Sequence, residues 1–208
     1  MFRRAGIGLG LMAIATAGLA QPAAATSPRT QTTVHDFTTF DPIDGASATL
    51  TRTRSGLSAT FKTTLPAGNA ETLWWVIFNN PNGCTIGAEG CGDDEILTAF
   101  GGGPNPGQVT IQNADGRVVP GSGRVTFAAR LNVGSDGPGE VLLPGGITNP
   151  MGALILLVVD EHGPASPDPE TRRLQTHALL APGACSNQTA DDPFGDCFDA
   201  QIAIFPPS

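Results

Sequence analysis

The stretch Glu71–Glu95 reads ETLWWVIFNNPNGCTIGAEGCGDDE and decides the class of fold. Every position from Leu73 to Phe78 is apolar. A strand with one buried face alternates apolar and polar residues, so this continuous run predicts a central strand that is packed on both faces. Because successive side chains of a strand point to opposite faces, Trp74 and Trp75 are predicted to lie on opposite sides of the sheet.

Other segments also show strand patterns. Ala46–Leu65 alternates apolar and polar residues on both sides of Ser55-Gly56, which predicts a β-hairpin. Gly123–Leu131 alternates in the same way. The remaining candidate strands are the continuous apolar run Met151–Val159 and the short segments Arg172–Leu180 and Ala200–Pro206. With 27 glycines and 18 prolines available for turns, these short strands predict an all-β fold, an antiparallel β-sandwich of the immunoglobulin-like kind with Gly/Pro-rich loops.

The N-terminus has the pattern of a secretory signal peptide. Arg3 and Arg4 precede the apolar, uncharged run Ala5–Ala20. We predict cleavage after Ala25, with a cut after Ala20 as the alternative. A membrane anchor is also conceivable, but the run is shorter than the ~20 residues that a spanning helix needs.

The domain organisation follows from this reading. We expect a signal peptide at residues 1–25, a polar and disordered segment at 26–33, and one β-sandwich domain at 34–208. The processed chain has about 180 residues, which fits a single domain. No membrane span is expected in it, and the predicted location is extracellular or periplasmic.

The charge balance excludes some partners. The chain is acidic, with a formal net charge of −8, and two of its eleven basic residues lie in the predicted signal peptide. Lys62 is the only lysine. Such a surface argues against binding to nucleic acids or anionic membranes.

The four cysteines predict disulfide bonds, because their number is even and the chain is expected to be exported. Three pairings are possible. Cys84–Cys91 with Cys185–Cys197 is favoured, because both pairs are local. A zinc site is disfavoured, because zinc ligand pairs are usually spaced about two to four residues apart.

Two acidic clusters flank these cysteines. Asp93 and Asp94 follow Cys91. Three further aspartates, Asp191, Asp192 and Asp196, precede Cys197 in the run DDPFGD, and Asp199 follows that cysteine. Calcium prefers several carboxylate oxygens that lie close together in a loop. Calcium is therefore a candidate ligand of either loop, and a solvated acidic loop is the alternative.

A second candidate metal site involves histidines. Asp160 and His162 would share a face if their strand continues, and a hairpin could bring His177 beside them. Asp160, His162 and His177 would then form a transition-metal site or an acid–base pair. The alternative is a strand-end histidine that only hydrogen-bonds a neighbouring loop.

Three segments resemble a group of uncharacterised secreted bacterial all-β proteins. They read LWWVIFNNPNGC, ALILLVVDEHGPA and CFDAQIAIFPP. The chain is also faintly similar to chordin-type (CHRD) domains, which implies a CHRD-like secreted sandwich without an established catalytic role. Leu154-Ile155-Leu156 stands where such domains usually carry His-x-His, which argues against a shared metal or ligand role. The group has no established catalytic residues that could be carried over to this chain.

The sequence carries no nucleophile motif of the known hydrolase families. We therefore expect a secreted, non-enzymatic binding or structural module for an extracellular or envelope ligand, with calcium as a stabilising ion. Two alternatives stay open. One is a metal-dependent enzyme that uses Asp160, His162 and His177. The other is a carbohydrate-binding module that uses an exposed tryptophan.

Overall fold

The computed structural model describes residues 28–86 and 91–208. The predicted signal peptide lies outside these residues. The strands, in chain order, are β1 (Arg29–Thr32), β2 (His35–Asp36), β3 (Ser47–Thr53), β4 (Gly56–Thr64), β5 (Asn69–Phe78), β6 (Val109–Val118), β7 (Arg124–Asn132), β8 (Val141–Leu143), β9 (Leu154–Pro164) and β10 (Phe198–Phe205). The helical elements are η1 (Pro81–Gly83), α1 (Asp93–Phe100) and α2 (Pro169–Gln175).

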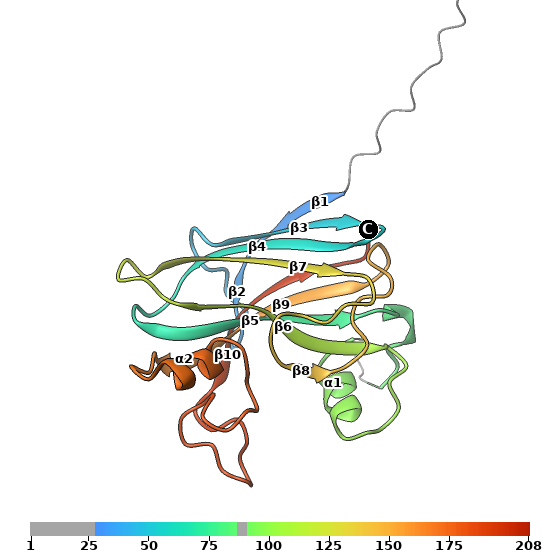
Figure 1. Ribbon diagram of the computed structural model, residues 1–208. Coiled ribbons are helices and arrows are strands. Elements are labelled where there is room, and N and C mark those ends of the chain that lie inside the picture. The colour runs from blue at the N-terminus through green and yellow to red at the C-terminus, as the bar shows by residue number, and fades with distance from the viewer. Residues whose placement is uncertain (1–27, 87–90) are drawn as a thin grey trace, which may run out of the picture.

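Two antiparallel sheets pack face to face, as Figure 1 shows. The four-stranded sheet has the order β1-β3-β4-β7, and the six-stranded sheet has the order β2-β10-β9-β5-β6-β8. The predicted all-β sandwich is therefore confirmed. The predicted hairpin is β3–β4, and β5 lies between β9 and β6 inside its sheet.

The main core lies between the two sheets. Phe61 of β4 and Phe127 of β7 meet edge to face, with their ring centroids 6.3 Å apart. Trp75 belongs to this core, whereas Trp74 belongs to a second apolar cluster on the opposite face of β5. Both tryptophans are buried, so the predicted division between two faces is confirmed.

A buried arginine joins the two sheets. Arg52 of β3 donates hydrogen bonds to the carbonyl oxygens of Pro150 and Ala153, which precede β9. It also donates to those of Phe205, the last residue of β10, and Pro206, which follows it. Its side chain is buried among these acceptors. Burial lowers the pKa of Arg52, yet an arginine stays charged at any physiological pH.

The disulfide prediction is confirmed. Cys84 is bonded to Cys91, and Cys185 is bonded to Cys197. The first bond closes the loop that leads from β5 into α1, and the second closes the loop before β10. Such bonds persist in an oxidising compartment. Within the described residues, no helix is both long and apolar enough to cross a membrane.

Two local predictions are wrong. The segment 26–33 was expected to be disordered, yet Arg29–Thr32 forms β1 and pairs with β3. Its side chains are largely exposed, and main-chain hydrogen bonds hold it at the sheet edge. Alternation of apolar residues therefore could not reveal it, since such a pattern reports a buried face.

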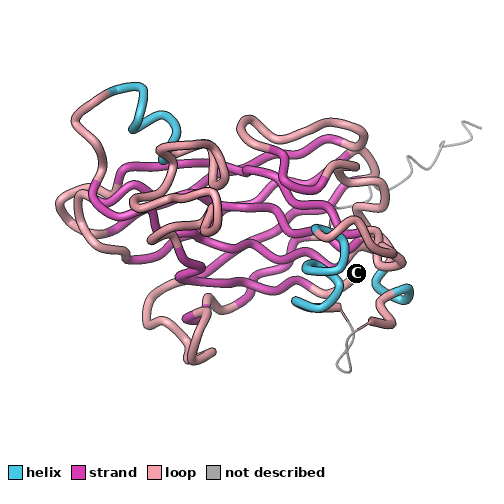
Figure 2. The backbone as a smooth tube through the Cα atoms, turned by 90° about the horizontal axis from the view of Figure 1, so that it is seen from below, coloured by secondary structure: helices cyan, strands magenta, loops and turns pink. Residues whose placement is uncertain are grey.

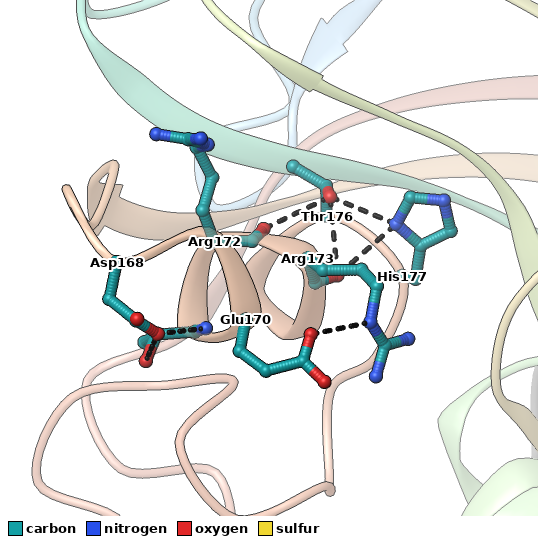
Figure 3. A network of polar contacts seen from close by, with 7 residues as sticks. Asp168, Glu170, Arg172, Arg173, Thr176 and His177 are labelled. Carbon is teal, nitrogen blue, oxygen red and sulfur yellow. Dashed lines mark hydrogen bonds and ion pairs between the residues drawn. The ribbon is translucent and has the colours of Figure 1, made fainter.

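The predicted strand Arg172–Leu180 is also wrong, because its first part lies in α2. Asp168 caps this helix by accepting a hydrogen bond from the Thr171 backbone N–H at 2.7 Å (Figure 3). Pro169 occupies the first helical position, where proline is favoured. These start signals outweigh the β-like composition of the segment.

Candidate functional site

The outer face of the six-stranded sheet is apolar along its central strands. Side chains of β5, β6, β9 and β10 point away from the main core and form a floor. The floor consists of Trp74, Val76, Ile111, Leu156, Val158 and Ile202. A sheet face of this kind must be covered by other elements or bind a ligand.

Two separate segments rise beside this floor. Figures 1 and 2 place α1 and α2 near opposite ends of the face. One wall is α1, which follows the Cys84–Cys91 loop. The other is the segment that follows α2 and contains the Cys185–Cys197 loop. The apolar side chains of the two walls are Ile96, Leu97 and Phe100 from α1, and Leu179, Leu180 and Phe194 from the C-terminal segment.

The walls leave a groove of about 580 Å³ above the floor. Several apolar side chains at its edge are open to solvent, with Leu97 67 % exposed, Phe194 45 % and Phe100 38 %. Large exposed apolar side chains gathered around one concavity are typical of a binding site. We refer to this concavity as the sheet groove.

A pair of carboxyl groups lies at one end of the sheet groove. Asp160 of β9 and Asp199 of β10 are direct partners across the two strands, and both line the groove. Asp160 is only 3 % exposed, whereas Asp199 is exposed. Burial raises the pKa of Asp160 well above its usual value, and the hydrogen bond and negative charge of Asp199 add to this effect.

A further buried carboxyl group lies on the opposite face of the sheet. Glu71 of β5 is fully buried opposite Glu161 of β9. Burial, together with the negative charge of Glu161, raises the pKa of Glu71 to about 9. Neither carboxyl oxygen of Glu71 has a hydrogen-bond partner among the described residues. Glu71 also contributes to the raised pKa of Asp160.

His162 takes part in a series of hydrogen bonds beside the groove that runs from Trp74 to Ala184. The Trp74 indole N–H donates to Thr72 Oγ1 at 2.7 Å, and Thr72 Oγ1 lies 2.8 Å from His162 Nε2. His162 Nδ1 lies 3.0 Å from the Ala184 carbonyl oxygen. Because a carbonyl only accepts, Nδ1 carries the proton and Nε2 accepts from Thr72. Burial lowers the pKa of His162, while the hydrogen bond to Ala184 opposes this shift.

His162 also approaches the second disulfide. Its Nδ1 lies 3.1 Å from Cys197 Sγ, and among the described residues His162, Cys185 and Cys197 are the one group of three potential metal ligands within 4.8 Å of one another. The two sulfur atoms are bonded to each other, so neither is a thiolate ligand. Through its contact with the Ala184 carbonyl oxygen, His162 links β9 to the segment that carries the second disulfide, which is the geometry that the loop-bonding alternative expected.

His177 lies elsewhere. It follows α2, where its Nδ1 contacts the Arg173 carbonyl oxygen at 3.1 Å and Thr176 Oγ1 at 2.9 Å (Figure 3). The hairpin that was expected to bring His177 beside Asp160 and His162 does not form. These three side chains do not converge on a common ligand position.

The calcium candidates lie on the two walls. Asp93 and Asp94 are in the first turn of α1, where a negative charge interacts favourably with the helix dipole. In the C-terminal loop, Asp192 accepts a hydrogen bond from the Gly195 backbone N–H, and Asp196 accepts one from Asn187 Nδ2.

Asp191 completes this set and is exposed. Across the residues that the structure describes, these aspartates do not form a compact group of three ligand atoms. Calcium binding at either wall stays a prediction.

The sequence missed the roles of two acidic residues. Glu71 lies two residues before Leu73 and therefore on the same face of β5, and this was the available indication of its burial. Asp199 was grouped with the acidic loop. Its pairing with Asp160 depends on β10 lying beside β9, which no local pattern reveals.

Comparison of the chain with protein-family models, with curated proteins and with solved structures gives no match. A function for the sheet groove is therefore inferred from its own geometry.

Proposed function

We propose that this protein is an exported, non-enzymatic binding module that holds a small apolar ligand in the sheet groove. The observation that carries the proposal is a concavity of about 580 Å³ with an apolar floor and two apolar walls. Sites for small molecules usually measure about 300–1,000 Å³ and combine mostly apolar linings with a few polar groups. Export is supported by the two disulfides and by the signal-like N-terminus.

The walls support a binding role in another way. A disulfide lies in or beside each wall: Cys84–Cys91 before α1, and Cys185–Cys197 before β10. Each crosslink ties together two chain positions in or beside a wall of the groove. A preordered site loses less conformational entropy when the ligand binds.

The alternatives find less support. A carbohydrate site usually needs an exposed aromatic face, and Trp74 and Trp75 are 2 % and 0 % exposed. The enzyme alternative needed Asp160, His162 and His177 together, and His162 is engaged in the chain from Trp74 to Ala184.

A titration with the neutral apolar dye Nile red tests the proposal. We expect saturable binding with enhanced dye fluorescence. Leu156→Trp places a larger side chain on the groove floor and should weaken binding at least about tenfold, equivalent to about 1.4 kcal/mol. Val133→Trp is the matched control, because Val133 is exposed and lies outside the groove. Equal dye binding by the parent protein and Leu156→Trp would contradict the proposal.

A further inference from the structure

The sheet groove contains a polar group that the protein itself leaves incomplete. Asp160 is only 3 % exposed, and it lines the groove. Its Oδ1 has no hydrogen-bond partner among the described residues. A buried polar atom without a partner costs about 1–3 kcal/mol, so such an atom on a residue that lines a groove points to a ligand that would complete it.

The same carboxyl pair lines a second, smaller space. A cavity of about 400 Å³ adjoins the groove and is lined by Asp160, Asp199, Phe37 and Phe198, among others. Asp160 and Asp199 therefore lie where the two spaces meet. A polar head group could reach them while an apolar chain extends along the groove.

The charges of the lining have one sign. The groove is lined by Asp93, Asp160 and Asp199, and its described lining contains no lysine, arginine or histidine. The whole chain carries a formal net charge of −8. Such a site attracts cations and repels carboxylates and phosphates.

We propose that the ligand of the sheet groove is an apolar amine, whose ammonium group binds Asp160 and Asp199 while its hydrocarbon chain lies on the groove floor. This inference rests on the proposed function, because it names the chemical class of ligand for the same groove.

An ammonium group suits this pair of acids. It offers three hydrogen-bond donors and accepts none, so it can donate to the unpaired oxygen of Asp160 and also to Asp199. A hydrogen bond between charged groups is stronger than a neutral one, particularly away from water. An ammonium group beside Asp160 favours the ionised carboxylate and so opposes the rise in pKa that burial causes.

The length of the groove floor indicates how long the hydrocarbon chain of the ligand is. Leu156, Val158 and Asp160 occupy successive outward positions on β9, and this segment spans roughly 13 Å at the usual rise per strand residue. A straight chain of about ten carbons lies along this distance with its head group at Asp160. The other end then reaches α1, where Leu97 and Phe100 are exposed.

Three probes that share a ten-carbon chain separate the contributions of chain and head group. Decylamine, decanol and decanoate are titrated at pH 7, below their aggregation concentrations, and binding is followed by tryptophan emission, since Trp74 lines the groove. We expect decylamine to bind at least about tenfold more tightly than decanol, and decanoate to bind more weakly than both.

Two variants assign the preference to the carboxyl pair. Asp160→Asn and Asp199→Asn should reduce decylamine binding to the level of decanol, while decanol binding stays unchanged and shows that the variant is folded. Asp44→Asn is the matched control, because it removes an exposed carboxylate outside the groove. Since Asp199 is exposed, Asp199→Asn keeps the test available if Asp160→Asn does not fold.

The outcomes distinguish the two proposals. Equal binding of decylamine and decanol, or tighter binding of decanoate, overturns the amine inference and leaves the apolar groove intact. Retention of the amine preference in both aspartate variants also overturns it. Failure of all three probes to bind contradicts the proposed function itself.

Discussion

Replacing Glu71 by glutamine should stabilise this protein increasingly as the pH rises. Glu71 is fully buried, and neither carboxyl oxygen has a partner among the described residues. Its position opposite Glu161 places a second acid beside it. The ionised form is therefore unfavourable in the folded chain, while an unfolded chain ionises freely. Glutamine keeps the shape of the neutral acid and removes the titration.

The size of the effect follows from the pKa of Glu71, which burial and Glu161 raise from its usual 4.5 to about 9. Between these values the folded protein holds a proton that the unfolded chain has lost. The stability that this bound proton contributes is therefore fully present below pH 4.5 and is lost as the pH rises toward 9. The loss is about 1.4 kcal/mol per pH unit, or about 4 kcal/mol between pH 5 and pH 8.

Urea unfolding at pH 5, 6, 7 and 8 measures this slope. The parent protein should lose stability with pH, and Glu71→Gln should lose about 1.4 kcal/mol less per pH unit. The two proteins should be similar near pH 5. Glu170→Gln serves as the control, because it removes an exposed glutamate of α2. Parallel pH profiles for the parent protein and Glu71→Gln would refute the reasoning.

Three other predictions concern the buried arginine, the second disulfide and the acidic loop. Arg52→Met should lower the free energy of unfolding by on the order of 3 kcal/mol or more, measured in urea, because it leaves buried carbonyl oxygens without a donor; an unchanged urea midpoint would contradict this role. Replacing Cys185 and Cys197 together by alanine should cost about 3 kcal/mol and weaken Nile red binding, since the loop that they close forms part of a wall; undiminished dye binding would separate the disulfide from the groove. Calcium should raise the melting temperature measured in chelator, and Asp191→Asn or Asp192→Asn should cancel the rise; the same melting curve with and without calcium would remove these residues as ligands.

The sequence predicts most strands with buried faces, because burial imposes a pattern on the residues. The exception is β6, whose buried positions include the polar residues Thr110, Gln112 and Asn113 and so do not show that pattern. Alternation located the β3–β4 hairpin and β7, and continuous apolar runs located β5 and β9. It failed for β1, whose side chains are largely exposed, and for α2, where the cap at Asp168 and Pro169 decides the structure. Apolar periodicity carries little information about either kind of element.

The sheet groove could not be predicted in the same way. Its floor is assembled from β5, β6, β9 and β10, and its two walls come from segments that are far apart in the chain. Asp160 was a candidate from sequence, but Asp199 gained its role only from strand pairing. The local disulfides were predictable because each joins cysteines that are close in sequence.

The most direct test of the groove as a ligand site uses the two tryptophans of the chain. Trp74 lines the groove, whereas Trp75 lies in the core between the sheets. Their indole N–H resonances give one NMR signal on each side of β5. Addition of decylamine should shift the Trp74 signal in a saturable manner and leave the Trp75 signal in place. A saturating probe that shifts neither signal, or shifts only that of Trp75, would contradict a ligand site in the sheet groove.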